Sequence, residues 1–191
     1  MKRLLRWLAA LALLAAAGAS VAQPQQRLLA AQSEIAFTSR QMGVPVDGRF
    51  RKFDAEIAFD PLRPQAARIA LRIDLASVAL ASADAEAELA KPGWFDSRRR
   101  PVAEFTSSAV RPAGANRFDV AGRLTIKGVT REIVVPVTLA AAGASAAVAS
   151  GGYTLQRLAF GIGDGDWSDT SLVADDVQVR FRLVVEGLGV P

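Results

Sequence analysis

The sequence predicts an all-β protein of about eight amphipathic antiparallel strands with one short helix. Three observations support this prediction. Most of the chain alternates apolar and polar residues with a period of two, turn signals follow one another at short intervals, and only one segment has a helical composition. This pattern is typical of a sandwich or an up-and-down barrel, and periodicity alone leaves both open.

The alternation is clearest in four segments. They are Arg68–Leu75, Val120–Ile126, Ile133–Leu139 and Val177–Val185. In the last of these, apolar side chains alternate with Gln178 and two arginines. Such strands are half-buried, with one apolar and one polar face. The apolar faces, which include Leu71, Ile73, Val179 and Phe181, are therefore expected to point toward the interior.

A bend is expected inside the longest strand. Over 46–59 the apolar positions change parity at Arg51-Lys52, as a β-bulge would require. Turn residues at Asp60-Pro61, Pro112–Asn116 and Lys127-Gly128 indicate connections between neighbouring strands.

One helix is predicted over Ser82–Ala90. Ser82 provides an N-cap, two acidic residues follow early in the segment, and Pro92-Gly93 ends it. The stretch Leu139–Gly152 is almost entirely Ala, Gly and Ser, and it is interpreted as a loop or a weakly specified strand.

The N-terminal segment has the features of a secretory signal peptide. Three basic residues precede an apolar run over Trp7–Ala17, and Ser20-Val21-Ala22 forms a small-x-small cleavage site. The apolar run is shorter than the ~20 residues of a membrane-spanning helix, which disfavours an uncleaved anchor. We predict a signal peptide over 1–22, one domain over 23–191, and a periplasmic or secreted protein.

The charge of the mature chain is close to neutral. The whole chain has 23 Lys and Arg against 19 Asp and Glu, and the predicted signal peptide holds three of the basic residues. The difference of 20 and 19 gives about +1, which does not favour binding to nucleic acid. The basic cluster Arg98–Arg100 is interpreted as a solvated turn, with contact to an anionic head group as the alternative.

Residues for catalysis or metal binding are scarce. The chain has no cysteine and no histidine, which removes thiol chemistry, the usual general base and the commonest metal ligand. The acidic loop around Asp164, Asp166 and Asp175 has the spacing of a calcium loop, but Asp169 stands where that loop requires glycine. We predict no metal and no catalysis, with a hydrolase that uses these carboxylates as an alternative.

Four separated motifs make the chain recognisable. They read FTSRQMGVPVDGRFRKFDAEIAFD, LAKPGWFDSRRRPVAEFTS, GRLTIKGVTREIVVPVTL and LQRLAFGIGDGDWSD. Together, from about Ser33 to Val185, they resemble the YceI-like family of exported polyisoprenoid-binding proteins. Two positions depart from the family pattern: Arg40-Gln41, where relatives often carry histidine, and Ala159, where they often carry an acid.

The resemblance implies a single eight-stranded, lipocalin-like antiparallel barrel. Its apolar interior would hold a long isoprenoid lipid, such as a polyprenyl phosphate or an isoprenoid quinone, in a non-catalytic carrier. No other cofactor is expected. Transient membrane contact is expected, the oligomeric state is left open, and a structural or interaction module is an alternative. Trp167 is expected to cover the mouth, and the family motifs place the following residues along the interior: Phe37, Phe50, Phe59, Trp94, Phe95, Phe105, Leu124, Ile126 and Phe160.

Overall fold

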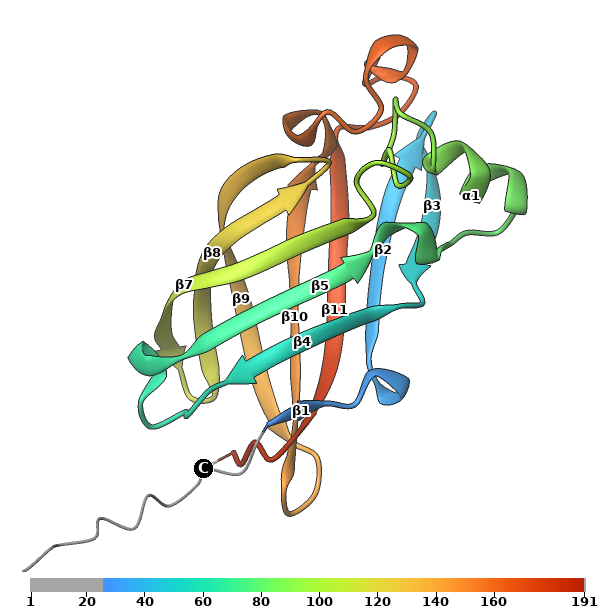
Figure 1. Cartoon of the computed structure of the whole chain (residues 1–191). Coiled ribbons are helices and arrows are strands. Elements are labelled where there is room, and N and C mark those ends of the chain that lie inside the picture. Colours follow the sequence, from blue (N-terminus) through green and yellow to red (C-terminus); the bar gives the residue numbers. More distant parts are fainter. Residues whose placement is uncertain (1–25, 191) are drawn as a thin grey trace, which may run out of the picture.

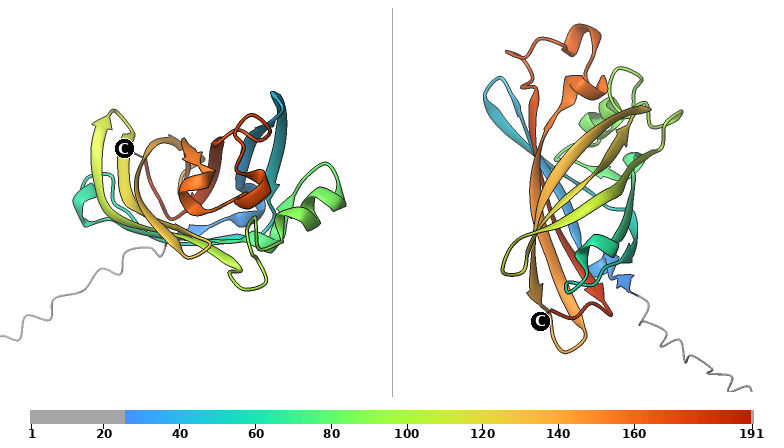
Figure 2. Two further views of the ribbon diagram at one scale, coloured as in Figure 1. Left: turned by 90° about the horizontal axis from the view of Figure 1, so that it is seen from above. Right: turned by 90° about the vertical axis from the view of Figure 1, so that its left-hand side faces the viewer.

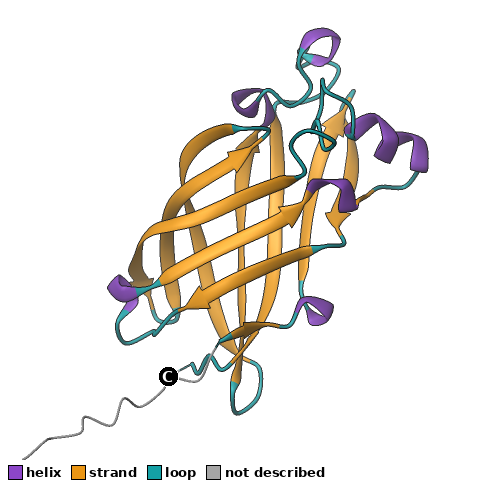
Figure 3. Ribbon diagram, in the orientation of Figure 1, coloured by secondary structure: helices purple, strands orange, loops and turns teal. Residues whose placement is uncertain are grey.

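One curled antiparallel sheet makes up most of the molecule, and short helices lie beyond the strand ends (Figures 1 and 3). This computed structural model describes residues 26–190. The predicted signal peptide lies outside the described residues.

The sheet follows the order β4-β5-β7-β8-β9-β10-β11-β2-β3-β6, and β1 pairs with β11. Neighbours along most of this path are consecutive in sequence, as in a meander. Seen along its strands, the sheet curls around an interior (Figure 2). The strands are β1 (Arg27–Leu28), β2 (Glu34–Gln41), β3 (Val44–Phe50), β4 (Phe53–Ala58), β5 (Arg68–Asp74), β6 (Val78–Ala79), β7 (Val102–Gly114), β8 (Arg117–Ile126), β9 (Val129–Ala141), β10 (Ala146–Gln156) and β11 (Asp176–Glu186).

The count of eight strands differs from the eleven in the structure. The bend expected at Arg51-Lys52 separates β3 from β4, and each half pairs with a different neighbour, β2 or β5. Two-residue strands, β1 and β6, account for the rest of the difference. The all-β class is confirmed, but the hydrogen-bonded path ends at β4 and β6, so the sheet is a curled half-barrel.

The helices are short. The predicted helix is α1 (Ala83–Leu89), and Ser82 caps it by accepting a hydrogen bond from the Ala85 amide. The 3₁₀ turns are η1 (Ala30–Gln32), η2 (Pro64–Ala66), η3 (Leu75–Ser77), η4 (Arg157–Phe160) and η5 (Gly165–Trp167).

Two hairpins end in two-residue turns that require positive φ. Met42 and Gly43 connect β2 to β3 with φ of 48° and 80°, and Lys127 and Gly128 connect β8 to β9 with φ of 52° and 79°. These values are typical of type I′ turns, whose twist matches that of the flanking strands.

The segment rich in small residues forms parts of two strands. Within 139–152, β9 continues to Ala141 and β10 begins at Ala146. Gly151 lies opposite Phe181 on β11, and a Cβ there would lie 2.7 Å from the Phe181 ring. The absence of a side chain at this position makes room for the aromatic ring.

Two other strand glycines also contact phenylalanine rings. A Cβ at Gly48 would lie 2.3 Å from Cζ of Phe37, and one at Gly122 would lie 2.5 Å from Cζ of Phe105. Glycine therefore lets these rings lie close against the wall of the sheet. A side chain at Gly48 or Gly122 would push the neighbouring ring further into the interior.

We predict that Gly48→Ala destabilises the protein by about 1–3 kcal/mol, because the new Cβ forces the Phe37 ring to move. Urea unfolding measures this change. Gly189→Ala is the matched control, since a Cβ there meets nothing within 4 Å. Equal stability of the two variants would contradict the close contact between ring and glycine.

Candidate ligand-binding cavity

The concave face of the sheet surrounds an apolar cavity of about 660 Å³. This volume lies in the usual range of small-molecule sites, ~300–1,000 Å³. On β9 and β11, outward side chains are exposed, whereas the inward ones between Ile133 and Val137 and between Val177 and Leu183 are only half-buried. In a filled core these inward positions would be fully buried, so the incomplete burial reflects the hollow that they face.

Most of the residues predicted for the interior lie on the wall of this cavity. Thirteen of the fourteen line it: Phe37, Phe50, Phe59, Leu71, Ile73, Trp94, Phe95, Phe105, Leu124, Ile126, Trp167, Val179 and Phe181. The structure places Phe160 elsewhere. Its side chain is 1% exposed and packs in a core cluster with Leu155 and Ile162, because η4 turns it away from the strands.

Two core clusters lie at opposite ends of the cavity wall. One, near the β7–β8 turn, is entirely apolar and includes Phe59 and Phe118, whose rings meet edge to face with centroids 5.1 Å apart. The other includes Leu75 and Phe160 and lies beside η4. On the wall beside this second cluster, the ring centroid of Phe50 lies 6.1 Å from that of Phe95.

The exposed parts of the lining indicate where the cavity opens. Gln41 at the end of β2 and Asp84 at the start of α1 line the cavity and are exposed. Trp167 in η5 also lines it, and its ring centroid lies 5.6 Å from that of Trp94. We define the mouth as the region between the β2–β3 turn, α1 and the loop 161–175, which lie at the same end of the sheet (Figure 1).

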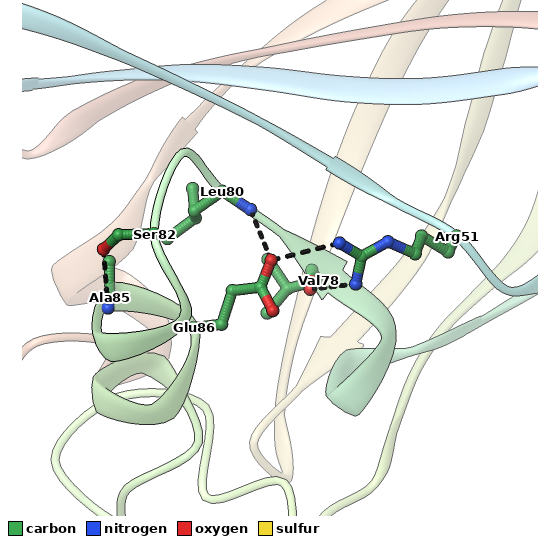
Figure 4. A network of polar contacts seen from close by, with 6 residues as sticks. All are labelled: Arg51, Val78, Leu80, Ser82, Ala85 and Glu86. Carbon is green, nitrogen blue, oxygen red and sulfur yellow. Dashed lines mark hydrogen bonds and ion pairs between the residues drawn. The ribbon is translucent and has the colours of Figure 1, made fainter.

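A polar network fixes α1 beside this mouth (Figure 4). The Glu86 carboxylate accepts hydrogen bonds from the Leu80 amide at 3.0 Å and from Arg51 Nη2 at 3.1 Å. Arg51 Nη1 in turn donates to the Val78 carbonyl at 3.4 Å. Since α1 contributes Leu89 to the cavity wall, this network positions part of the site.

Arg157 organises the loop at the mouth. Its side chain is 1% exposed, and its three nitrogens donate hydrogen bonds to five backbone carbonyls. The carbonyls belong to Ile162, Gly163, Trp167, Val173 and Ala174. Five bonds use all the N–H donors of a guanidinium group. Burial lowers the pKa of Arg157, and the nearby carboxylate of Asp175 opposes that shift.

Sequence reasoning missed Arg157, although a signal exists. In the stretch YTLQR, Tyr153, Leu155 and Arg157 share one parity, so a charged residue follows two inward positions. A charge at such a position is buried only when it is fully hydrogen-bonded. The pattern therefore points to a structural role for Arg157.

The acidic loop has partners of its own. Asp164 pairs with Lys127 at 3.1 Å, and Asp169 accepts hydrogen bonds from the hydroxyl and the amide of Ser171. The Ser171 hydroxyl in particular lowers the pKa of Asp169, whereas a general acid needs a raised pKa. Within residues 26–190, no group of three or more acidic side chains is placed to hold a metal ion.

The curled sheet and its apolar hollow define a class of small-molecule-binding β proteins. Residues 27–185 match the family model of the YceI-like domain. The chain therefore belongs to the YceI-like domain family, which confirms the resemblance seen in the sequence. This membership indicates a binding protein rather than an enzyme, in agreement with the prediction.

Known proteins with similar sequences support this assignment. A UPF0312 protein of Pseudomonas savastanoi pv. phaseolicola is 31% identical over 145 residues, 73% of each chain. The similarity to a UPF0312 protein of Azotobacter vinelandii is also 31% but spans 88 residues, 46% of each chain.

Solved structures share the fold. BcnA of Burkholderia cenocepacia is 41% identical, with a TM-score of 0.79 over 82% of this chain and 98% of BcnA. A polyisoprenoid-binding domain from Saccharophagus degradans is 19% identical, with a TM-score of 0.70 over 85% of this chain and 98% of that domain. Among the residues that the structure describes, no helix is long and apolar enough to cross a membrane.

The Glu86 network predicts a pH dependence of stability. The Leu80 amide, followed by Arg51, lowers the pKa of Glu86. A lowered folded-state pKa stabilises the protein above the unfolded pKa, and this contribution is lost as the pH falls through the folded value. We expect Glu86→Gln to lower the Tm at pH 7 and to have little effect at a pH of about 3. A Tm difference independent of pH, measured by circular dichroism, would contradict the role of this charge.

Proposed function

We propose that this protein binds a long-chain isoprenoid lipid in its cavity and carries or buffers it without catalysis. The observation that carries the proposal is the largely apolar wall of a hollow inside a single curled sheet. Each buried methylene contributes about 0.8 kcal/mol relative to water, so a hydrocarbon tail is retained without specific polar contacts. The Saccharophagus degradans domain, described as polyisoprenoid-binding, supports this ligand class through its shared fold.

The location we propose is the periplasm or the extracellular space, after removal of residues 1–22. The features that support it are the basic start, the short apolar run and the small-residue cleavage site. A carrier in this compartment exchanges its lipid with a membrane, where the tail is already in an apolar environment. The net gain on transfer is therefore small, which favours reversible loading.

The mouth also has the features of a surface for transient membrane contact. Met42 and Val44 at the β2–β3 turn are 69% and 63% exposed, and Leu172 is 41% exposed. The Met42 amide donates to the Leu172 carbonyl at 2.7 Å, which holds the turn beside the loop. Grouped apolar side chains next to the opening would enter the membrane surface where a lipid leaves it.

Filling the cavity tests lipid binding. Ala55 on β4 lines the hollow, whereas Ala58 on the same strand is exposed. We expect Ala55→Phe to lower the amount of isoprenoid lipid bound per protein by at least half, because the ring occupies tail volume. Ala58→Phe should bind as the wild type does. Mass spectrometry of loaded protein gives the occupancy, and equal occupancy in both variants would contradict the cavity as the binding site.

Membrane exchange has a separate test. We expect the double variant Met42→Ser, Val44→Ser to slow lipid transfer from phosphatidylcholine vesicles several-fold while leaving equilibrium occupancy unchanged. Val134→Ser is the control, because Val134 is 57% exposed on the outer face of β9. If the turn variant transfers lipid as fast as the control, the mouth does not contact the membrane through these residues.

A further inference from the structure

The polar side chains of the cavity wall are gathered at one end. The β7–β8 end is closed by an apolar cluster. The polar and charged lining residues lie instead at the C-terminal end of β2, on α1 and near the junction of β10 with η4. They are Ser39, Gln41, Asp84, Glu88, Tyr153 and Arg157. An amphiphile in this cavity would therefore place its tail toward the apolar cluster and its head toward the mouth.

The charges of the cavity-lining residues at this end do not favour an anion. Asp84 and Glu88 bring two carboxylates to the lining, and Lys91 pairs with Glu88. Arg157 is the one cationic residue among the described lining residues, and backbone carbonyls occupy all of its N–H donors. A buried phosphate needs cationic donors to offset its loss of hydration, and the described wall has none free.

The basic cluster Arg98–Arg100 does not supply them. These three arginines are exposed and lie outside the cavity lining. The Arg100 guanidinium lies directly against Gly128 in the β8–β9 turn, where a Cβ would be 1.7 Å from Nη1. These exposed positions agree with the interpretation of Arg98–Arg100 as a solvated turn.

The same end offers neutral hydrogen-bond donors. Tyr153 lines the cavity, and burial raises the pKa of its hydroxyl, which keeps the group protonated. Trp94 also lines the cavity, and its indole N–H is buried without a partner in the described part of the chain. A buried donor without a partner costs about 1–3 kcal/mol, so a ligand oxygen that reaches these groups is favoured.

We infer that the cavity selects lipids with a neutral, oxygen-bearing head, such as a carbonyl or hydroxyl group, over lipids with a phosphate head. The inference rests on the proposed function and adds to it the chemistry of the head group. Tyr153 acts as a specificity-determining residue through its hydroxyl. Asp84 repels an anionic head near the mouth, and Glu88 adds a second carboxylate whose charge Lys91 partly offsets.

Two probes with the same tail test this selection. Geranylgeraniol and geranylgeranyl monophosphate differ only in the head, and quenching of the fluorescence of Trp94 and Trp167, which line the cavity, reports binding. We expect the alcohol to bind the wild-type protein at least tenfold more tightly at pH 7.5. If geranylgeranyl monophosphate binds as tightly as geranylgeraniol, or more tightly, the preference for a neutral head is wrong, while the proposal of lipid binding stands. If neither probe binds, the proposed function itself fails.

Variants separate the two sources of selection. Asp84→Asn with Glu88→Gln should tighten phosphate binding at least threefold and leave alcohol binding within twofold. The matched control, Asp119→Asn with Glu132→Gln, removes two exposed carboxylates from the outer face of β8 and β9. Equal effects of the two pairs on phosphate binding would overturn the role of the mouth carboxylates.

Tyr153→Phe tests the hydroxyl. We expect this variant to bind geranylgeraniol about threefold to tenfold more weakly, the range of one hydrogen bond. Binding of a C20 isoprenoid hydrocarbon without oxygen should stay unchanged, which a merely structural defect would not allow. Unchanged binding of the alcohol would remove Tyr153 from the site, and equal weakening of both probes would show that the substitution acts on packing.

Discussion

The fold and the cavity both depend on one constraint: a single curled sheet places the apolar side chains of every strand on its concave face. A sandwich would cover that face with a second sheet, and an α/β protein would cover it with helices. Here the described chain offers only short helices at the ends of the strands. The apolar face therefore curls around the space that its side chains leave, and that space is the cavity.

Glycine and phenylalanine together set the width of this space. Large aromatic rings would fill a narrow interior, but Phe37, Phe105 and Phe181 lie close to strand glycines. The rings thus contribute apolar surface to the wall without closing the hollow. The two ends of the cavity then differ in character, because one ends in an apolar cluster and the other in a loop held by Arg157.

The sequence was sufficient to predict most of the long strands, the inward parity, the helix and the bend, because each depends on local alternation or on a local cap. The separation of β3 from β4 into differently paired strands could not be predicted, since pairing depends on contacts across the sheet. The alternation of apolar and polar residues could not predict the position of Phe160 either, because η4 interrupts that alternation at Arg157. The hydrogen bonds of Arg157 involve a loop whose path no local pattern specifies.

The central claim is that the hollow holds an isoprenoid tail in the native protein. The most direct measurement is mass spectrometry of organic extracts from protein purified from its own compartment. Native mass spectrometry of the intact protein then gives the number of lipid molecules bound per chain. The account predicts a bound lipid with repeating five-carbon units and a neutral head, near one molecule per chain. Repeated recovery of lipid-free protein, or of a phosphorylated lipid, would contradict it.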